Sequence, residues 1–239
     1  MTIPLLPDTD LARIAPMSDE LKRSALKQMK GGFSTFSYKP VRSCFGEVFN
    51  VELGMFGPLE PAPWDKIRDQ LTRACKAGDE LKNNLQIAKA LHDYATSCSI
   101  MGRRHEFFAM PMGAGRKVSF WLPMILAIEA KPYAVFIDPR RTKGLTELGR
   151  RFVFSMMHER IRAADEDFAS VNLGIIRFTD NDDSRVVRLF SDEGVKLYSL
   201  GELEAMVAST YRIWQEVFEE RTAEARRKGT GTGGLFYGL

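Results

Sequence analysis

Apolar residues recur every three or four positions in five stretches of the chain, and that spacing predicts α-helices with one buried face. The clearest helix covers residues 200–227, where Ser199 and Glu202 form a capping box in front of a long apolar stripe. The other predicted helices cover residues 18–30, 63–77, 79–98 and 145–164. Gly31 and Gly78 punctuate two of the boundaries, as helix ends favour.

Runs of apolar, aromatic and β-branched residues without helical spacing predict strands. The predicted strands cover residues 105–111, 117–128, 133–137, 171–178 and 186–190, and residues 33–56 read as two more strands that could form a hairpin. Only residues 129–132 separate the runs 117–128 and 133–137. A parallel crossover needs about a dozen residues or more, so these two strands are predicted to be antiparallel neighbours.

This order of elements predicts an α/β protein with a mixed β-sheet flanked by helices. We divide the chain into an N-terminal α/β extension (1–62), a core (63–198), and a C-terminal helix with a glycine-rich tail (199–239). The tail ends in apolar residues, Leu235 to Leu239, which is unusual for a free terminus. The segment is either a disordered terminus or, as its apolar residues favour, one that docks on a partner or on the protein's own core.

Composition narrows the class of protein only slightly. The chain has 239 residues, 44% of them hydrophobic, and a formal net charge of +3, which permits a polyanionic partner without requiring one. Its three cysteines lack the spacing of a zinc site or a disulfide framework. The first residues lack the pattern of a signal peptide, and no apolar run approaches a membrane span of roughly 20 residues. We therefore expect a cytoplasmic protein without membrane association.

The candidate chemistry lies where the run 133–137 ends. Asp138 follows this run, and Pro139, Arg140 and Arg141 come next. An acidic residue at the end of a buried strand, with a cation two positions on, can hold a metal ion beside a phosphate. This pattern and the order helix, strand, strand, strand, helix, strand over residues 79–178 resemble the PD-(D/E)XK (restriction-endonuclease-like) superfamily.

The resemblance implies a restriction-endonuclease-like core at residues 63–198 and a set of site residues. Pro123 matches the proline of the family's motif, but Met124 stands at the position of the metal-binding aspartate. Asp138 falls at the position of the motif's glutamate, and Arg140 falls at that of its lysine. Glu80 lies in the first helix, where some members of the family have an extra carboxylate.

If the site is catalytic, the resemblance implies that Asp138 and Glu80 bind Mg²⁺, which prefers oxygen ligands. The metal would polarise a phosphodiester and activate water, and Arg140 would contact the scissile phosphate. A second alignment of the motif takes Glu129, Ala130 and Lys131 literally as Glu-x-Lys. Simple turn and capping roles could also explain both patterns, because short acid-x-base patterns are common by chance.

Two functions follow from this resemblance. The first is a metal-dependent nuclease acting on DNA or another nucleic acid, with basic residues on the phosphate backbone, namely Arg141, Lys143, Arg150 and Arg151. The second is an inert nuclease-like scaffold that binds a protein partner as a subunit of a larger complex, or forms a homo-oligomer. Met124, the apolar tail and the stripe of the C-terminal helix favour this second function.

Overall fold

The computed structural model describes residues 3–29, 37–51, 53–54, 57–58, 61–76, 78–112, 117–180 and 184–229. The helices in these ranges are α1 (Asp8–Ile14), α2 (Asp19–Gln28), α3 (Lys39–Ser43), α4 (Phe45–Val48), α5 (Trp64–Ala74), α6 (Asp79–Ser97), α7 (Glu147–Met157) and α8 (Leu200–Gly229). A π-helical turn, η1 (His158–Arg162), continues α7, and a short 3₁₀ helix, η2 (Glu166–Phe168), follows it.

The main sheet has five strands in the order β3 (Met101–Arg104), β6 (Met124–Ile128), β7 (Lys131–Ile137), β8 (Asn172–Asp180) and β9 (Arg185–Ser191). β7 and β8 are parallel, and the other neighbours are antiparallel, so the sheet is mixed. Two small antiparallel pairs complete the strands, β1 (Leu53–Gly54) with β2 (Gly57–Pro58) and β4 (Met110–Pro111) with β5 (Lys117–Val118). The predicted α/β class with a mixed, helix-flanked sheet is confirmed.

The turn between β6 and β7 has the conformation that a tight hairpin requires. Glu129 and Ala130 have φ values of 50° and 61°, the left-handed region in which two-residue hairpin turns hold both central residues. Register follows from this turn, with Ile128 opposite Lys131 and Ile125 opposite Ala134. The predicted antiparallel pairing of these strands is confirmed.

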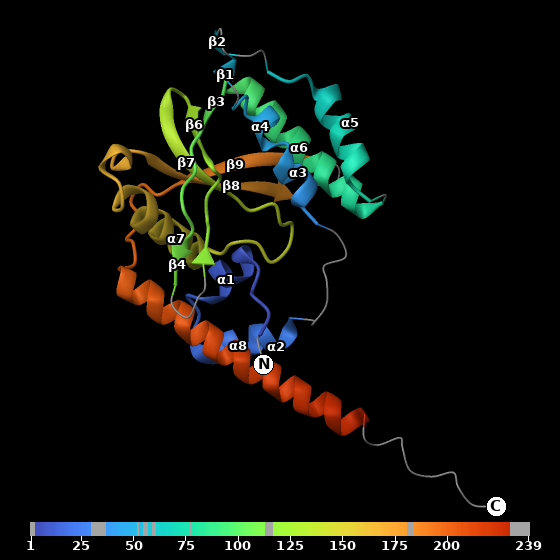
Figure 1. Ribbon diagram of the computed structural model, residues 1–239, viewed down its shortest axis with the longest axis vertical. Helices are drawn as coiled ribbons and strands as arrows, with labels where there is room; N and C mark the ends of the chain where they lie inside the picture. The colour runs from blue at the N-terminus through green and yellow to red at the C-terminus, as the bar shows by residue number, and fades with distance from the viewer. Residues whose placement is uncertain are drawn as a thin grey trace, which may run out of the picture.

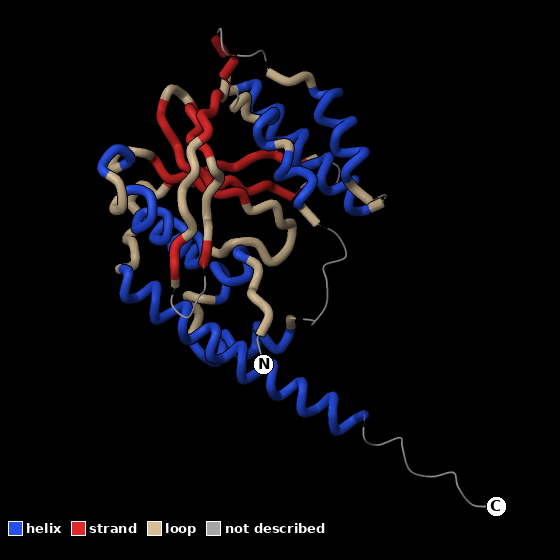
Figure 2. Tube along the Cα trace, viewed as in Figure 1, coloured by secondary structure: helices blue, strands red, loops and turns tan. Residues whose placement is uncertain are grey.

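Helices cover both faces of the sheet (Figures 1 and 2). One hydrophobic cluster joins α3, α4, α5 and α6 to one face, and a second joins α1, α2, α7 and α8 to the other. The strands alternate between the two clusters: Ala134 and Phe136 belong to the second, whereas Val135 and Ile137 belong to the first. The sheet therefore separates two apolar layers, each covered by helices.

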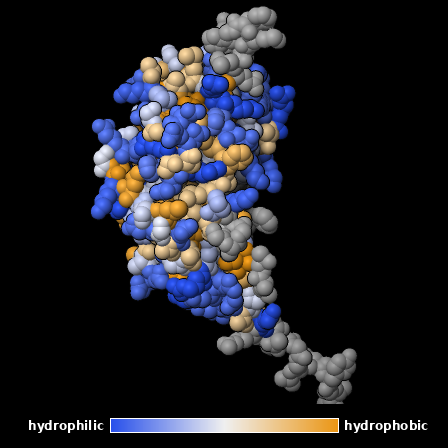
Figure 3. Space-filling model, turned by 60° about the vertical axis from the view of Figure 1, so that its left-hand side comes forward, coloured by the Kyte–Doolittle hydropathy of each residue, from blue (hydrophilic) through white to orange (hydrophobic). Residues whose placement is uncertain are grey.

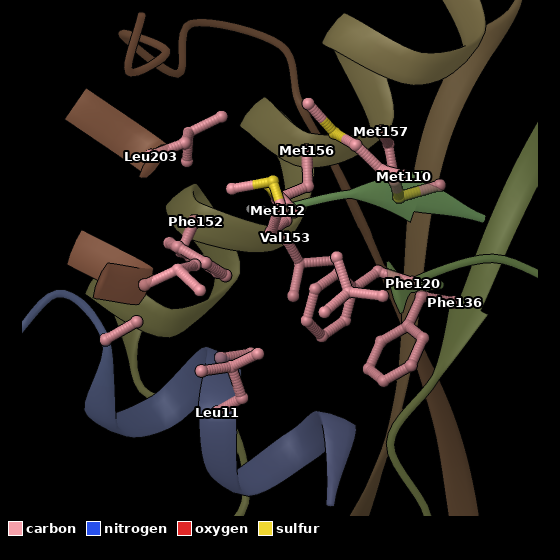
Figure 4. Packing of buried hydrophobic residues seen from close by; sticks show 14 of the residues in the cluster. Leu11, Met110, Met112, Phe120, Phe136, Phe152, Val153, Met156, Met157 and Leu203 are labelled. Atoms are coloured by element: carbon pink, nitrogen blue, oxygen red, sulfur yellow. The ribbon is translucent and has the colours of Figure 1, made fainter. Parts of the chain in front are cut away.

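Large aromatic and sulfur-containing side chains fill the second layer. Phe120 is fully buried between Phe136 and Phe152, with ring centroids 5.8 and 5.9 Å away in edge-to-face geometry. Met156 and Met157 of α7 lie close by with the methionines of the β4 segment (Figure 4). This packing fixes α7 against the sheet and, through α7, positions α1 and α8.

The C-terminal helix uses its apolar stripe within the chain. The capping box is present, since the backbone N–H of Ser199 donates to Glu202 Oε2 at 2.8 Å. Leu203, Val207 and Trp214 are buried in the second layer. α8 packs along α2 and against α7, so the stripe that was expected to meet a partner is covered by the protein itself. The apolar tail, Leu235 to Leu239, lies outside the described residues.

The prediction of two strands at residues 33–56 is wrong for most of the described part. This part contains α3 and α4, and only β1 is extended. The composition is aromatic and β-branched, but the buried residues Val41, Phe45, Val48 and Phe49 have helical spacing. Burial against α6 outweighs the weak preference of these residue types for strands.

The boundaries of the central strands also differ from prediction. The edge strand beside β6 is β3, and the predicted strand 105–111 contributes only the two residues of β4. The run 117–128 divides into β5 and β6, with Pro123 just before the second. Residues 1–62 contribute to both apolar layers, through α1 and α2 on one face and α3 and α4 on the other. Whether the three predicted segments behave as separate units stays a prediction.

Candidate functional site

Asp138 lies just beyond β7 and is fully buried. Its Oδ2 accepts a hydrogen bond from the backbone N–H of Leu145 at 2.7 Å, and its Oδ1 accepts one from the N–H of Arg140 at 3.3 Å. Burial raises the pKa of Asp138, and these two hydrogen bonds and the nearby arginines oppose the rise. The carboxylate thus closes the loop between β7 and α7.

Arg140 turns away from the sheet edge and binds the N-terminal helix. Its two terminal nitrogens donate to the two oxygens of Asp10 at 2.6 and 2.8 Å. Arg13 approaches the same carboxylate at 3.4 Å. Burial alone would raise the pKa of Asp10, but the hydrogen bond and charge of Arg140, and the charge of Arg13, bring it below its ordinary value. This ion pair fastens α1 to the loop after β7.

Arg177 of β8 completes the surroundings of Asp138. Its Nε lies 3.4 Å from Asp138 Oδ2 and is buried without a hydrogen-bond partner. Gly144 passes so close that a Cβ there would lie 2.6 Å from Arg177 Nη2 and 2.8 Å from Asp138 Oδ2. A side chain at this position would therefore force Arg177 or the buried carboxylate of Asp138 to move.

The structure does not bring the alternative motif residues to Asp138. Glu129 lies in the exposed turn before β7, and Lys131 begins that strand, whereas Asp138 follows its other end. The length of β7 separates them by roughly 20 Å. Glu80 is half-buried in the first turn of α6. The described residues contain no group of three or more His, Cys, Asp or Glu side chains that could hold a metal ion. The expected Mg²⁺ stays an untested prediction.

The basic residues expected on a nucleic acid have other surroundings. Arg150 lies over the ring of Phe190, 4.4 Å from its centroid, and Arg151 lies over Tyr198 at 3.7 Å. Lys143 is exposed with a φ of 55°, and Arg141 is half-buried. Two of the four cations therefore rest on aromatic rings beside α7.

A hollow of about 650 Å³ opens near the C-terminal end of β7, between α1 and α4. Aromatic and charged side chains line it together, among them Trp121, Phe136, Asp8, Glu47 and Arg42. Burial raises the pKa of Asp8, and the charge of Arg42 opposes that rise. Open α/β sheets tend to have clefts beyond the carboxyl ends of their strands. That tendency could have predicted this hollow once the fold was known, but the sequence motif around Asp138 did not indicate it.

An exposed aromatic side chain, that of Phe108, is another feature that sequence reasoning missed. Phe108 is 75% exposed, and Arg160 of η1 donates to its carbonyl oxygen at 2.7 Å while lying over its ring. In the same segment, the ring centroid of His105 lies 4.5 Å from those of both Phe107 and Phe168. The segment was predicted to be a strand, in which these rings would alternate between faces.

The rest of the visible surface is mostly polar. The face shown in Figure 3 is dominated by hydrophilic residues, with hydrophobic residues in small groups between them. In the described ranges, no helix is both long and apolar enough to cross a membrane.

Comparison with known proteins gives a family. The model of the family described as the sliding clamp-binding bacterial toxin SocB matches residues 9–224. A curated relative, the DNA replication inhibitor toxin SocB of Caulobacter vibrioides (strain NA1000 / CB15N), is 35% identical over 227 residues, which cover 95% of each chain. No solved structure matches the chain.

These matches overturn the resemblance to the PD-(D/E)XK superfamily, together with the nuclease activity and DNA binding inferred from it. The motif lacked its diagnostic aspartate at Met124, and the buried Asp138 and the paired Arg140 instead hold the fold together. The alternative inference, a protein that binds a partner, agrees better with the family's description. The chain belongs to the SocB family of sliding clamp-binding bacterial toxins.

Proposed function

We propose that this protein is a toxin that inhibits DNA replication by binding the sliding clamp. The observation that carries the proposal is the 35% identity to the Caulobacter toxin over 95% of both chains. Because the match includes the sheet and both helical layers, the two proteins share a whole folded unit rather than a short motif. The toxin would then act by protein binding. Replication is inhibited because a clamp that has bound the toxin cannot bind the replication proteins that need it.

The exposed ring of Phe108 is the described feature best suited to such a contact. Its backbone is held by the hydrogen bond from Arg160, and the adjacent residue Phe107 packs its ring against that of Phe168, with centroids 5.2 Å apart. An exposed aromatic side chain on a rigid base loses little conformational entropy on binding and buries much apolar area. We therefore infer that Phe108 inserts into an apolar site on the clamp.

The test uses the purified chain and the sliding clamp of the same organism. Binding is measured by isothermal titration calorimetry, and DNA synthesis is followed on a long primed template with and without the clamp and its loader. The proposal expects a saturable complex and loss of clamp-dependent synthesis, with clamp-independent synthesis unchanged.

Two results would contradict the proposal. One is the absence of a complex between the folded chain and the clamp. The other is equal inhibition of synthesis with and without the clamp, which would place the target in the polymerase or the template. Added clamp in excess of the toxin should restore DNA synthesis, because it binds the toxin and leaves clamp free. This titration is the internal control.

A further inference from the structure

Three arginines gather on the face of the sheet that α7 covers. Arg177 of β8 and Arg188 of β9 are directly opposite each other in the antiparallel pair, so they point to the same face. Arg150 of α7 lies 4.4 Å from the centroid of the Phe190 ring, and Arg188 lies 5.8 Å from the same centroid. Phe190 thus brings Arg150 and Arg188 together, and the strand register adds Arg177.

The described residues neutralise this cluster only in part. Asp138 faces Arg177, but it also lies beside Arg140 and is fully buried. Glu147 acts on Arg150 from one turn earlier in α7. Burial lowers the pKa of Arg150, and the positive charges of Arg177 and Arg188 lower it further, because like charges disfavour the charged form. Like charges placed directly opposite on two strands are destabilising.

Space for a ligand lies beside the cluster. Arg150 and Phe190 form one wall of a hollow of about 410 Å³, and Arg151 and Lys196 add two more cations to it. Glu147 and Glu193 also line the hollow, so two carboxylates stand there against the three cations Arg150, Arg151 and Lys196. This volume exceeds what a phosphoryl group requires. Arg188 does not line the hollow, but it is exposed to solvent and lies over the ring of Phe190, which does.

We propose that Arg150, Arg177 and Arg188 form a binding site for a phosphoryl group of a small molecule. Guanidinium groups present planar forks of N–H donors that match the oxygens of phosphate. A phosphoryl group carries close to two negative charges and three acceptor oxygens, so it can meet three arginines at once. A single carboxylate offers one charge and two oxygens. The site lies apart from Phe108 and does not depend on the proposed function.

The experiment is titration of the full chain with pyrophosphate in magnesium-free chloride buffer, followed by calorimetry. Wild-type protein is expected to bind pyrophosphate saturably at one site. Arg188→Gln, at an exposed position, is expected to weaken binding about tenfold, because a charged hydrogen bond is lost. Arg103→Gln is the matched control, since Arg103 is exposed on β3 at the opposite edge of the same sheet.

Malonate, a dicarboxylate, distinguishes the chemistry of the ligand. Three results together support the site. Arg188→Gln binds pyrophosphate more weakly than wild type, Arg103→Gln binds it with wild-type affinity, and wild type binds malonate much more weakly than pyrophosphate. Absence of saturable binding overturns it, as does equal binding by Arg188→Gln. Equal affinity for malonate overturns the assignment to a phosphoryl group. Thermal unfolding of each variant in chloride verifies that the chain is folded.

Discussion

Asp10 and Arg140 are 130 positions apart in the sequence, yet they form the best-aligned ion pair at the loop after β7. The pair is mostly shielded from water, since the Asp10 side chain is 12% exposed and that of Arg140 is 24% exposed. Removing one member of such a pair leaves the other charge without its partner, which costs more than the pair itself contributes. The N-terminal helix therefore depends on this carboxylate for its attachment.

The acid dependence of stability tests this role. The folded-state pKa of Asp10 lies below the ordinary value of 3.8, so its stabilisation is present at higher pH and is lost as the pH falls through that folded-state pKa. Asp10→Asn should lower the free energy of unfolding by about 2 kcal/mol at pH 7. In urea titrations, this difference from wild type should narrow below about pH 5. Asp69→Asn, at an exposed position on α5, is the control and should change neither the free energy of unfolding nor its dependence on pH.

Gly144 offers a second test at the scale of one residue. Gly144→Ala would place a methyl group against Arg177 and the buried carboxylate of Asp138, so it should cost about 1–3 kcal/mol of stability. Gly201→Ala is the matched control, because a Cβ at that position in the first turn of α8 meets nothing within 4 Å. The control should be neutral or slightly stabilising. Equal effects of the two changes in thermal unfolding would contradict the close approach.

At the scale of elements, a side chain of α8 caps the C-terminal end of α2. The Nη2 of Arg221 donates to the carbonyl oxygens of Leu26, Lys27 and Met29 at 3.0, 3.0 and 2.6 Å. The last carbonyls of a helix have no partner within the helix, and a cation there also favours the helix dipole. A side chain from the end of the sequence thus stabilises a helix near its beginning.

Hydrogen exchange can measure this contribution. Arg221→Ala should speed amide exchange in the last turn of α2 about fivefold, the effect of losing about 1 kcal/mol of local stability. In Arg221→Lys the exchange rate should lie between those of wild type and Arg221→Ala, because lysine retains the charge but not the planar fork of donors. Arg212→Ala is the control, since Arg212 joins α8 to Asp19 at the other end of α2. Unchanged exchange in Arg221→Ala would show that α2 needs no cap from α8.

Periodicity in the sequence predicted the long elements and missed the short ones. α6, α8 and the β6–β7 hairpin each carry enough repeats of one spacing to identify them. α3 and α4 are too short for that, and aromatic residues in them favoured strands. Only one segment of the candidate site could be predicted from the sequence, the residues Asp138 and Arg140 after the strand 133–137. Their partners Asp10 and Arg177 lie far away in sequence, so the spacing of residues could not reveal that the charges hold the fold together.

At the scale of the whole molecule, the sheet carries helices on both faces, and these helices cover the apolar sides of the strands that the structure describes. The large hydrophobic residues that remain exposed in the described ranges are Leu5, Leu21, Met101, Phe108, Leu148, Val186 and Leu200. They are spread along the chain. The backbone of Phe108 is held by Arg160, and its neighbour Phe107 packs against the rings of His105 and Phe168. Single exposed apolar residues are ordinary, whereas an aromatic ring on a fixed base is typical of a binding hot spot.

The last prediction therefore compares Phe108 with another exposed residue in binding to the sliding clamp. Phe108→Ala should raise the Kd about tenfold or more and relieve inhibition of clamp-dependent synthesis. Leu21→Ala, which truncates a side chain 60% exposed on α2, should leave both unchanged. Neither change should alter stability by more than about 0.5 kcal/mol, because both side chains are exposed. Wild-type affinity in Phe108→Ala would place the contact elsewhere on the chain, whereas no binding by wild type would reject the proposed function itself.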